Sequence, residues 1–215
     1  AEDRLAGLIT VDDAMEILES EDTEDIHRVG GVAPLDVAYM DASVLQHARK
    51  RGMWLLVLIV AAASTITIME AFEDELAAVH VLAFFIPLLV DTGGNAGTQA
   101  STLVIRAMAV GEVRFSDLSR ILHRELRIGL LLGLALGSVS FVIISLLYGR
   151  DLGVVVAVTL VAICTWASFA GGLLPLLAKR LGVDPAVISG PLITTVVDAT
   201  GLIIYFLVAG VVLGL

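Results

Sequence analysis

Residues 87–102 read PLLVDTGGNAGTQAST, and this stretch decides how the rest of the chain is interpreted. It lies within an apolar segment long enough to cross a bilayer, yet it is crowded with polar side chains. Four of them recur at helical spacing and so share one face of a helix: Asp91, Asn95, Thr98 and Thr102. Unpaired polar groups in hydrocarbon cost several kcal/mol each, so this face must turn toward protein, water or an ion. We therefore predict that the face lines an ion path.

The composition is that of a polytopic membrane protein. Of the 215 residues, 58% are hydrophobic, and the mean hydropathy of +0.94 lies far above that of a soluble domain. The net charge is -10, with about half of the acidic side chains in roughly the first fifty residues. This distribution argues against nucleic acid as a partner. The single cysteine, Cys164, lies in an apolar run, so we expect a small buried residue.

The N-terminal stretch reads as soluble. Residues 4–11 favour a turn and a short strand, and Asp12 is a suitable N-cap for a helix that ends near Ser20. This piece is too small to own a core. We therefore expect residues 1–29 to be the tail of a larger cytosolic regulatory domain.

Residues 30–51 are predicted to form a linker and a connecting helix, the helix beginning at residue 35, and residues 52–215 a transmembrane domain. Five apolar spans have roughly the 20 residues needed to cross a bilayer: 52–69, 79–108, 126–148, 152–178 and 186–215. The fold class is therefore an all-α polytopic membrane protein. Span two should bend near Pro87 or at Gly93-Gly94, because proline and glycine pairs are the usual causes of kinks.

The loops predict the orientation in the cell membrane. Basic residues lie in alternate loops: Arg49, Lys50 and Arg51 before span one, Arg106, Arg114, Arg120, Arg124 and Arg127 between spans two and three, and Lys179 and Arg180 between spans four and five. The positive-inside rule then places the N-terminal segment in the cytoplasm and Leu215 outside.

Two carboxylates stand deep within apolar spans, Asp91 in span two and Asp198 in span five. Burying either one costs roughly 2.5–3.5 kcal/mol even on a lenient insertion scale, which leaves protonation, water or a bound cation as explanations. The face of span five that carries Asp198 is otherwise small or hydroxylated, and it comprises Gly190, Thr194, Asp198 and Gly201. A small face lets a partner helix or a hydrated ion approach closely.

The candidate ligands are all oxygen, which suits magnesium, calcium or manganese ions. Magnesium dehydrates reluctantly and is usually held by one or two carboxylates with several waters, so a site with few carboxylates fits it. Five helices are few for a whole pore. A homodimer would bring two copies of Asp198 together on the symmetry axis, with divalent cations and the lipid bilayer as the other partners.

Other interpretations stay open at this point. The glycines of the stretch could serve close helix packing alone, and Asp91 could be a protonated packing residue. Asp184, in Val-Asp-Pro-Ala, is most simply an N-cap followed by proline. A secondary transporter would use Asp91 or Asp198 to carry a proton in exchange for the cation. A membrane enzyme is unsupported, since no nucleophile–base pair, metal-cluster spacing or phosphate loop is visible.

The stretch 87–99 resembles the MgtE family of magnesium transporters. The resemblance continues, in the same order along the chain, at residues 105–107, 180–186 and 190–202. It covers all five spans. Residues 1–20 resemble the end of a CBS domain, the family's cytosolic sensor, and the helix of residues 35–51 sits where the family has its connecting or plug helix.

The resemblance implies a homodimeric channel of the cell inner membrane that is selective for Mg2+ and gated by cytosolic Mg2+. Its pore is then lined by spans two and five and lies at the two-fold axis. Mg2+ is then both the transported and the regulatory ion. Asp198 matches the pore aspartate that binds hydrated Mg2+, and Thr194 matches a position that contributes its backbone carbonyl. Thr98 and Thr102 match polar pore positions. Asp184 matches an acidic residue that closes the cytosolic gate, and Gly190 stands where the family often has asparagine.

Overall fold

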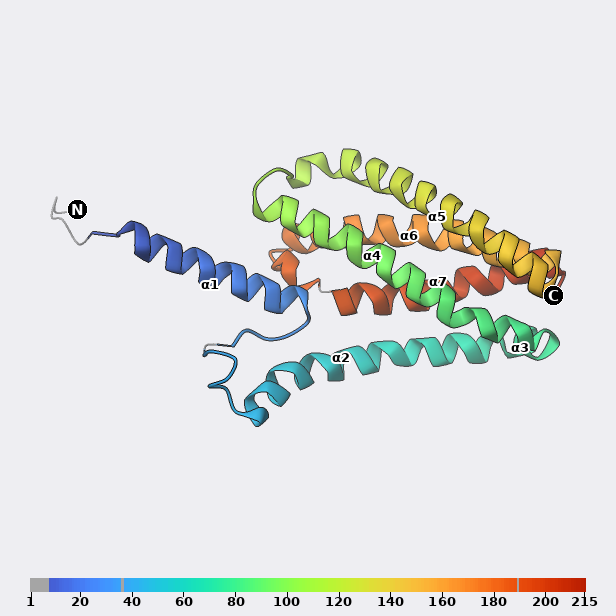
Figure 1. The fold of residues 1–215 in the computed structure, drawn as a ribbon, viewed down its shortest axis with the longest axis horizontal. Helices are drawn as coiled ribbons and strands as arrows, with labels where there is room; N and C mark the ends of the chain where they lie inside the picture. The colour runs from blue at the N-terminus through green and yellow to red at the C-terminus, as the bar shows by residue number, and fades with distance from the viewer. Residues whose placement is uncertain (1–7, 36, 189) are drawn as a thin grey trace.

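The computed structural model describes residues 8–35, 37–188 and 190–215, and these consist of helices joined by turns (Figure 1). Within them, five helical segments are long and apolar enough to cross a membrane, which confirms the predicted number of spans. The segments are α2 (Val44–Ala71), the 3₁₀ helix η1 (His80–Phe85) continued by α4 (Ile86–Ala109), η2 (Phe115–Asp117) continued by α5 (Leu118–Tyr148), α6 (Arg150–Arg180) and α7 (Gly190–Leu213). Three further elements complete the described chain: α1 (Val11–Val29), α3 (Glu73–Ala78) and η3 (Pro185–Val187).

The N-terminal helix α1 begins earlier and runs further than the sequence predicted. Its N-cap is Thr10, not Asp12, because Thr10 and Asp13 form a reciprocal capping box. The Asp13 amide donates to Thr10 Oγ1 at 3.1 Å, and the Thr10 amide donates to Asp13 Oδ2 at 2.8 Å. The expected short strand is wrong over residues 8–11, which lead directly into the helix, and residues 4–7 lie outside the described residues.

The predicted connecting helix from residue 35 is also wrong in its extent. Helix α2 begins only at Val44 and continues without a break into the first span. Ser43 is its N-cap and forms a capping box with Gln46, whose side-chain oxygen accepts a hydrogen bond from the Ser43 amide at 2.7 Å. The capping box at Ser43 therefore sets the start of the helix, and this start lies downstream of residue 35, where the helix was predicted to begin.

Span two is irregular where proline was expected to disturb it. The 3₁₀ helix η1 gives way to α4 at Ile86, and Pro87 occupies the first turn of α4, where a missing amide hydrogen costs nothing. The α-helix then runs through Gly93-Gly94 without interruption. The expected irregularity is confirmed next to Pro87, whereas a break at the glycine pair is wrong.

Glycines bring α5 and α6 into backbone contact, and these two helices lie side by side along their length (Figure 1). A β-carbon added at Gly129 would lie 2.5 Å from the carbonyl oxygen of Cys164. One added at Gly133 would lie 2.6 Å from the α-carbon of Val161. Close approach of this kind replaces the hydrophobic effect as the source of helix association in lipid. The buried position of Cys164 confirms its predicted packing role.

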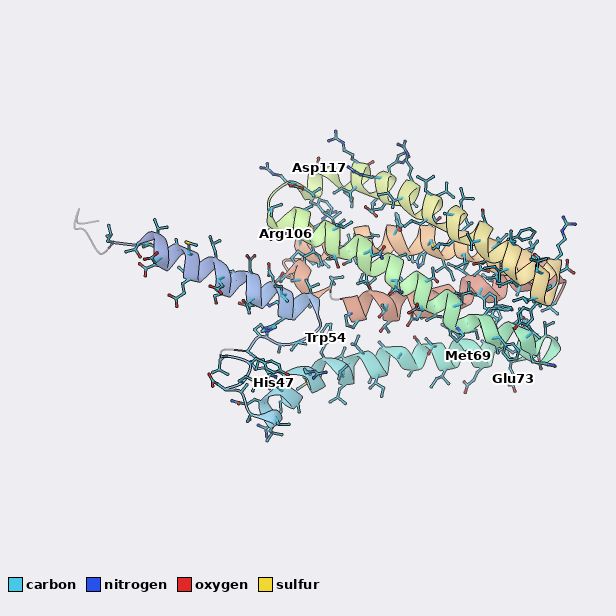
Figure 2. The ribbon with its side chains drawn as sticks, viewed as in Figure 1. His47, Trp54, Met69, Glu73, Arg106 and Asp117 are labelled. Carbon is cyan, nitrogen blue, oxygen red and sulfur yellow. The ribbon has the colours of Figure 1, made fainter. Side chains whose placement is uncertain are left out.

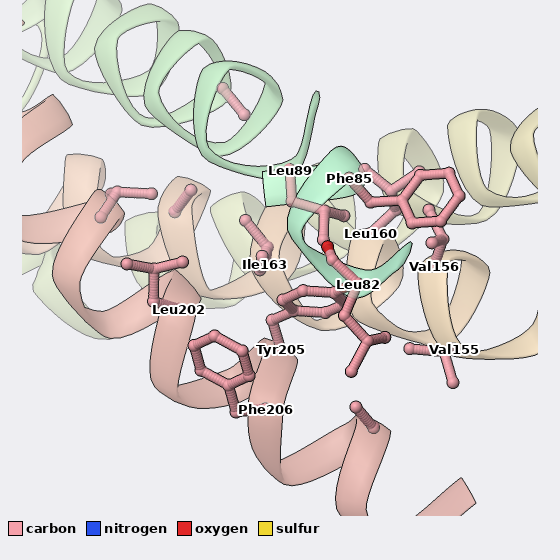
Figure 3. Packing of buried hydrophobic residues seen from close by; sticks show 14 of the residues in the cluster. Leu82, Phe85, Leu89, Val155, Val156, Leu160, Ile163, Leu202, Tyr205 and Phe206 are labelled. Atoms are coloured by element: carbon pink, nitrogen blue, oxygen red, sulfur yellow. The ribbon is translucent and has the colours of Figure 1, made fainter. Parts of the chain in front are cut away.

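A compact apolar cluster joins η1, α6 and α7 at one end of the bundle (Figure 3). Tyr205 and Phe206 are fully buried there, and the Tyr205 hydroxyl donates to the Leu82 carbonyl at 2.9 Å. That bond satisfies both a buried hydroxyl and a carbonyl of the 3₁₀ segment. The cluster thus fixes η1 against α7 and sets where α4 begins.

The two ends of the bundle differ in charge. His47 and Arg106 lie at one end and Glu73 at the other (Figure 2). Helix α1 projects from the basic end (Figure 1). The outer surfaces of α2 and α5 are lined with exposed large apolar side chains, as expected for helices that face lipid.

Candidate functional site

The site forms where α4 and α7 cross at a glycine. A β-carbon added at Gly94 would lie 3.0 Å from Thr194 Cγ2 and 3.7 Å from Asp198 Oδ1. Gly94 therefore lets the backbone of α4 approach the carboxylate of α7 at a distance that a side chain would prevent. Asp198 is partly exposed, and within the described chain no side chain or amide donates a hydrogen bond to it. Its oxygens are free to bind water or an ion.

Asp91 and Asn95 stand beside this crossing on α4. Asn95 Nδ2 donates to Asp91 Oδ2 at 3.1 Å, which is the helical spacing that the sequence predicted. Asp91 lies three residues before Gly94 on α4, so it belongs to the same crossing as Asp198. Both Asp91 and Asn95 are exposed in the single protomer. Two carboxylates and an amide thus share one region of the surface.

Thr98 meets Gly190 at the neighbouring turn of each helix. A β-carbon added at Gly190 would lie 3.1 Å from Thr98 Cγ2. Thr98 Oγ1 is buried and has no hydrogen-bond partner among the described residues. A buried hydroxyl normally has a partner, so this one could bond to a water molecule or an ion. Thr102 lies one turn further along the same face of α4 and is exposed. The structure therefore brings together the predicted residues of α4 and α7, with Thr102 at the edge.

The hydroxyl groups of α7 bond to their own helix. Thr194 Oγ1 and Thr195 Oγ1 both donate to the Pro191 carbonyl at 2.9 Å, a common arrangement in membrane helices. The Pro191 carbonyl therefore accepts two hydrogen bonds from its own helix. Thr200 accepts a bond from Trp166 Nε1 of α6 at 2.7 Å. Sequence reasoning missed this tryptophan, because nothing local to Trp166 indicates which helix it faces.

The donor set suits an ion that keeps much of its water. Across the described residues, no three histidine, cysteine, aspartate or glutamate side chains gather at one place. The α4–α7 crossing offers two carboxylates, one amide and one free hydroxyl. Such a set fits hydrated Mg2+, which binds through one or two carboxylates, better than Zn2+ or Cu2+.

Asp184 lies apart from this group, in the turn that opens η3. Its Oδ1 accepts a hydrogen bond from the Ala186 amide at 2.9 Å, which confirms the expected N-cap before proline, although the capped element is a 3₁₀ turn. Its other oxygen forms an ion pair with Arg28 of α1, and Arg28 also pairs with Glu24. Sequence reasoning missed Arg28. The only signal was its place four residues after Glu24 in an acidic helix.

A further carboxylate, Asp25, faces the same contact. Partial burial raises the pKa of Asp25 above its usual 3.8, and the nearby Asp184 carboxylate adds to this effect while Arg28 opposes it. At the contact between α1 and η3, the Arg28 guanidinium therefore bridges the carboxylates of Glu24 and Asp184, and Asp25 is a third carboxylate nearby. This contact is an electrostatic joint rather than an apolar one.

The five apolar spans and the oxygen-bearing side chains at the α4–α7 crossing together indicate the class of protein. It is a multi-pass membrane protein with a site suited to a cation. Comparison with known proteins gives the family. The family model for MgtE, described as a divalent cation transporter, matches residues 86–208. The chain belongs to this family of divalent cation transporters.

Three curated relatives carry the name magnesium transporter MgtE. The chain is 45% identical to that of Thermus thermophilus over 99% of its own length and 47% of the relative's. It is 34% identical to that of Enterococcus faecalis over 97% of the chain and 46% of the relative. It is 35% identical to that of Bacillus subtilis over 95% and 45%. The chain thus spans about half the length of the curated relatives it matches.

Proposed function

We propose that this chain is the membrane part of a magnesium transporter, a channel that admits hydrated Mg2+ along the face shared by α4 and α7. The ion is held chiefly by Asp198. The observation that carries the proposal is the contact at Gly94, because it sets the Asp198 carboxylate against the polar face of a second span. Asp91, Asn95, Thr98 and Thr102 then extend the hydrated path along α4, with Thr194 and Gly190 on α7.

A homodimer completes the path in this proposal. Asp91, Asn95 and Thr102 are exposed in one protomer although they belong to a segment apolar enough to cross a membrane. Polar groups do not face lipid, so a second copy related by a two-fold axis is expected to cover them. Two copies of Asp198 then flank the ion and supply the one or two carboxylates that Mg2+ prefers.

Regulation by cytosolic Mg2+ is proposed for the joint between α1 and Asp184. Helix α1 projects from the basic end of the bundle, and the positive-inside rule supports a cytoplasmic position for that end. Helix α1 has no buried residue and exposes apolar side chains such as Met15 and Leu18. That exposure supports the proposal that residues 1–29 end a CBS-type domain, with residues 30–51 as the link to the channel domain.

The test is Mg2+ influx into proteoliposomes at a set voltage, with Asp198→Asn compared against Asp151→Asn. Both variants remove one negative charge, but Asp151 is exposed at the start of α6, far from the crossing. We expect influx to vanish in Asp198→Asn and to persist in the control. Influx that persists in both variants would contradict the assignment of Asp198 to the ion path.

A second candidate is an exchanger of protons for divalent cations. It is favoured by the presence of two intramembrane carboxylates, Asp91 and Asp198, at one helix crossing, because an acidic side chain within a span can carry a proton. The same proteoliposomes discriminate the two functions. Influx that follows voltage and ignores an imposed pH gradient identifies a channel, whereas influx that needs the gradient identifies an exchanger.

A further inference from the structure

The beginning of α5 carries an unusual concentration of positive charge. Three exposed arginines and a histidine lie in its first turns: Arg120, His123, Arg124 and Arg127. The amino end of a helix carries a partial positive charge, so the place of Arg120 in the first turn of α5 is unfavourable by itself. No ion pair joins any of the three arginines to a carboxylate in the part of the chain that the structure describes, although the charge of Arg124 acts on the neighbouring Glu125 carboxylate. An anion bound here would relieve the repulsion.

The arginines surround a hollow rather than projecting singly. Its volume is about 430 Å³, and its lining consists of Arg120, His123, Arg124, Arg127, Ile128 and Leu131. The polar half is wholly basic, and the other half is apolar. Arg120, Arg124 and Ile128 also line the adjoining hollow toward α4, whose acidic side chains are Glu112, Asp117 and Glu125. Basic side chains therefore line one side of this hollow, and apolar side chains form its floor.

The apolar floor continues down the outside of α5. Ile128 is 38% exposed and Leu131 is 67% exposed, and further exposed leucines follow along the helix. The hollow lies in the first turns of α5, just after Asp117, which is at the same end of the bundle as Arg106 (Figure 2). A ligand with a negatively charged head and a hydrocarbon tail matches both halves at once.

We propose that this hollow, formed by Arg120, Arg124, Arg127 and Leu131, binds the phosphate head of an anionic phospholipid, with an acyl chain lying along α5. Guanidinium groups match phosphate oxygens in paired hydrogen bonds, and basic pockets at span ends suit anionic heads. The proposal rests only on α5 crossing the membrane and stands apart from the ion path.

The test counts phosphatidylglycerol molecules retained by the detergent-solubilised chain in native mass spectrometry. The variant is Arg120→Gln with Arg127→Gln, and the control is Arg49→Gln with Arg51→Gln, an exposed arginine pair at the same end of the bundle. We expect the affinity to fall about fivefold for each arginine removed from α5, and to change less than about twofold in the control. Phosphatidylcholine should show no difference between parent and variants.

Equal retention in parent and α5 variant would overturn the site, and so would equal losses in the α5 and control variants. Displacement of the lipid by millimolar inorganic phosphate would reassign the hollow to a soluble phosphate compound. A second measurement needs no variant: a photoactivatable phosphatidylglycerol should cross-link the parent chain within residues 120–131. Cross-links confined to other segments would refute the proposal even if the α5 variant failed to fold.

Discussion

The Asp198 carboxylate owes its position to a residue that has no side chain. Gly94 allows the approach of α4 to α7, and a β-carbon there would press on Thr194 at 3.0 Å. Asp198 therefore depends on a neighbour in another span for its setting, although its own sequence position marks it as unusual. The close approach at Gly94 explains why a glycine-rich stretch and an intramembrane carboxylate occur in one chain.

Replacing Gly94 with valine tests this dependence. The added methyl groups must push α7 away, so we expect the free energy of unfolding to fall by about 1–3 kcal/mol and most Mg2+ influx to be lost. Thermal unfolding in detergent and proteoliposome flux measure the two effects. Gly52→Val is the control, because a β-carbon at Gly52 of α2 meets nothing within 4 Å. Normal flux through Gly94→Val would show that the crossing has no part in the path.

At the scale of elements, α5 and α6 are held by backbone contact. Gly129→Ala would place a methyl group 2.5 Å from the Cys164 carbonyl oxygen, which only a separation of the helices can relieve. We expect a loss of about 1–3 kcal/mol in the free energy of unfolding, read from thermal unfolding in detergent. The control, Gly52→Ala, should be neutral or slightly stabilising, since alanine is the better helix former. Equal melting of the two variants would contradict the packing argument.

The joint between α1 and η3 should respond to pH. Because the pKa of Asp25 is raised in the docked helix, docking is favoured when Asp25 is protonated and weakens as the pH rises through that raised value. Amide hydrogen exchange of α1, corrected for its intrinsic pH dependence, should show protection that decreases upward from the ordinary aspartate pKa of 3.8. Asp25→Asn should remove much of this trend. A trend unchanged in that variant would assign the effect to other groups, such as the Arg28–Asp184 pair.

At the scale of the whole molecule, one protomer leaves a polar face of α4 uncovered. If a second copy covers it, the detergent-solubilised protein should have twice the chain mass of 22.6 kDa. Light scattering that separates protein from detergent measures this mass. Asp198 would then lie near the dimer axis, so cysteine introduced beside it in a Cys164→Ala background should cross-link between copies. A monomer with full Mg2+ influx would rule out a pore between two protomers.

Periodicity and composition sufficed for much of the architecture. The five spans follow from apolar length, and the common face of Asp91 and Asn95 follows from helical spacing, because both properties are local. Helix ends were less predictable. Thr10 and Ser43 cap α1 and α2 through side-chain bonds with residues three positions on. These bonds set other starts than the Asp12 cap predicted for the first helix and the apolar pattern predicted for the second.

By itself, the sequence determined that this is a membrane protein of several spans, that its polar side chains fall on particular helix faces, and that Asp91 and Asp198 need an explanation. Only the tertiary structure decided which faces meet. The contacts of Gly94 with α7, of Trp166 with Thr200 and of Arg28 with Asp184 join residues far apart in the chain. Such pairings depend on how whole helices pack, and helix packing in lipid is set by the fit of complete surfaces rather than by any local pattern.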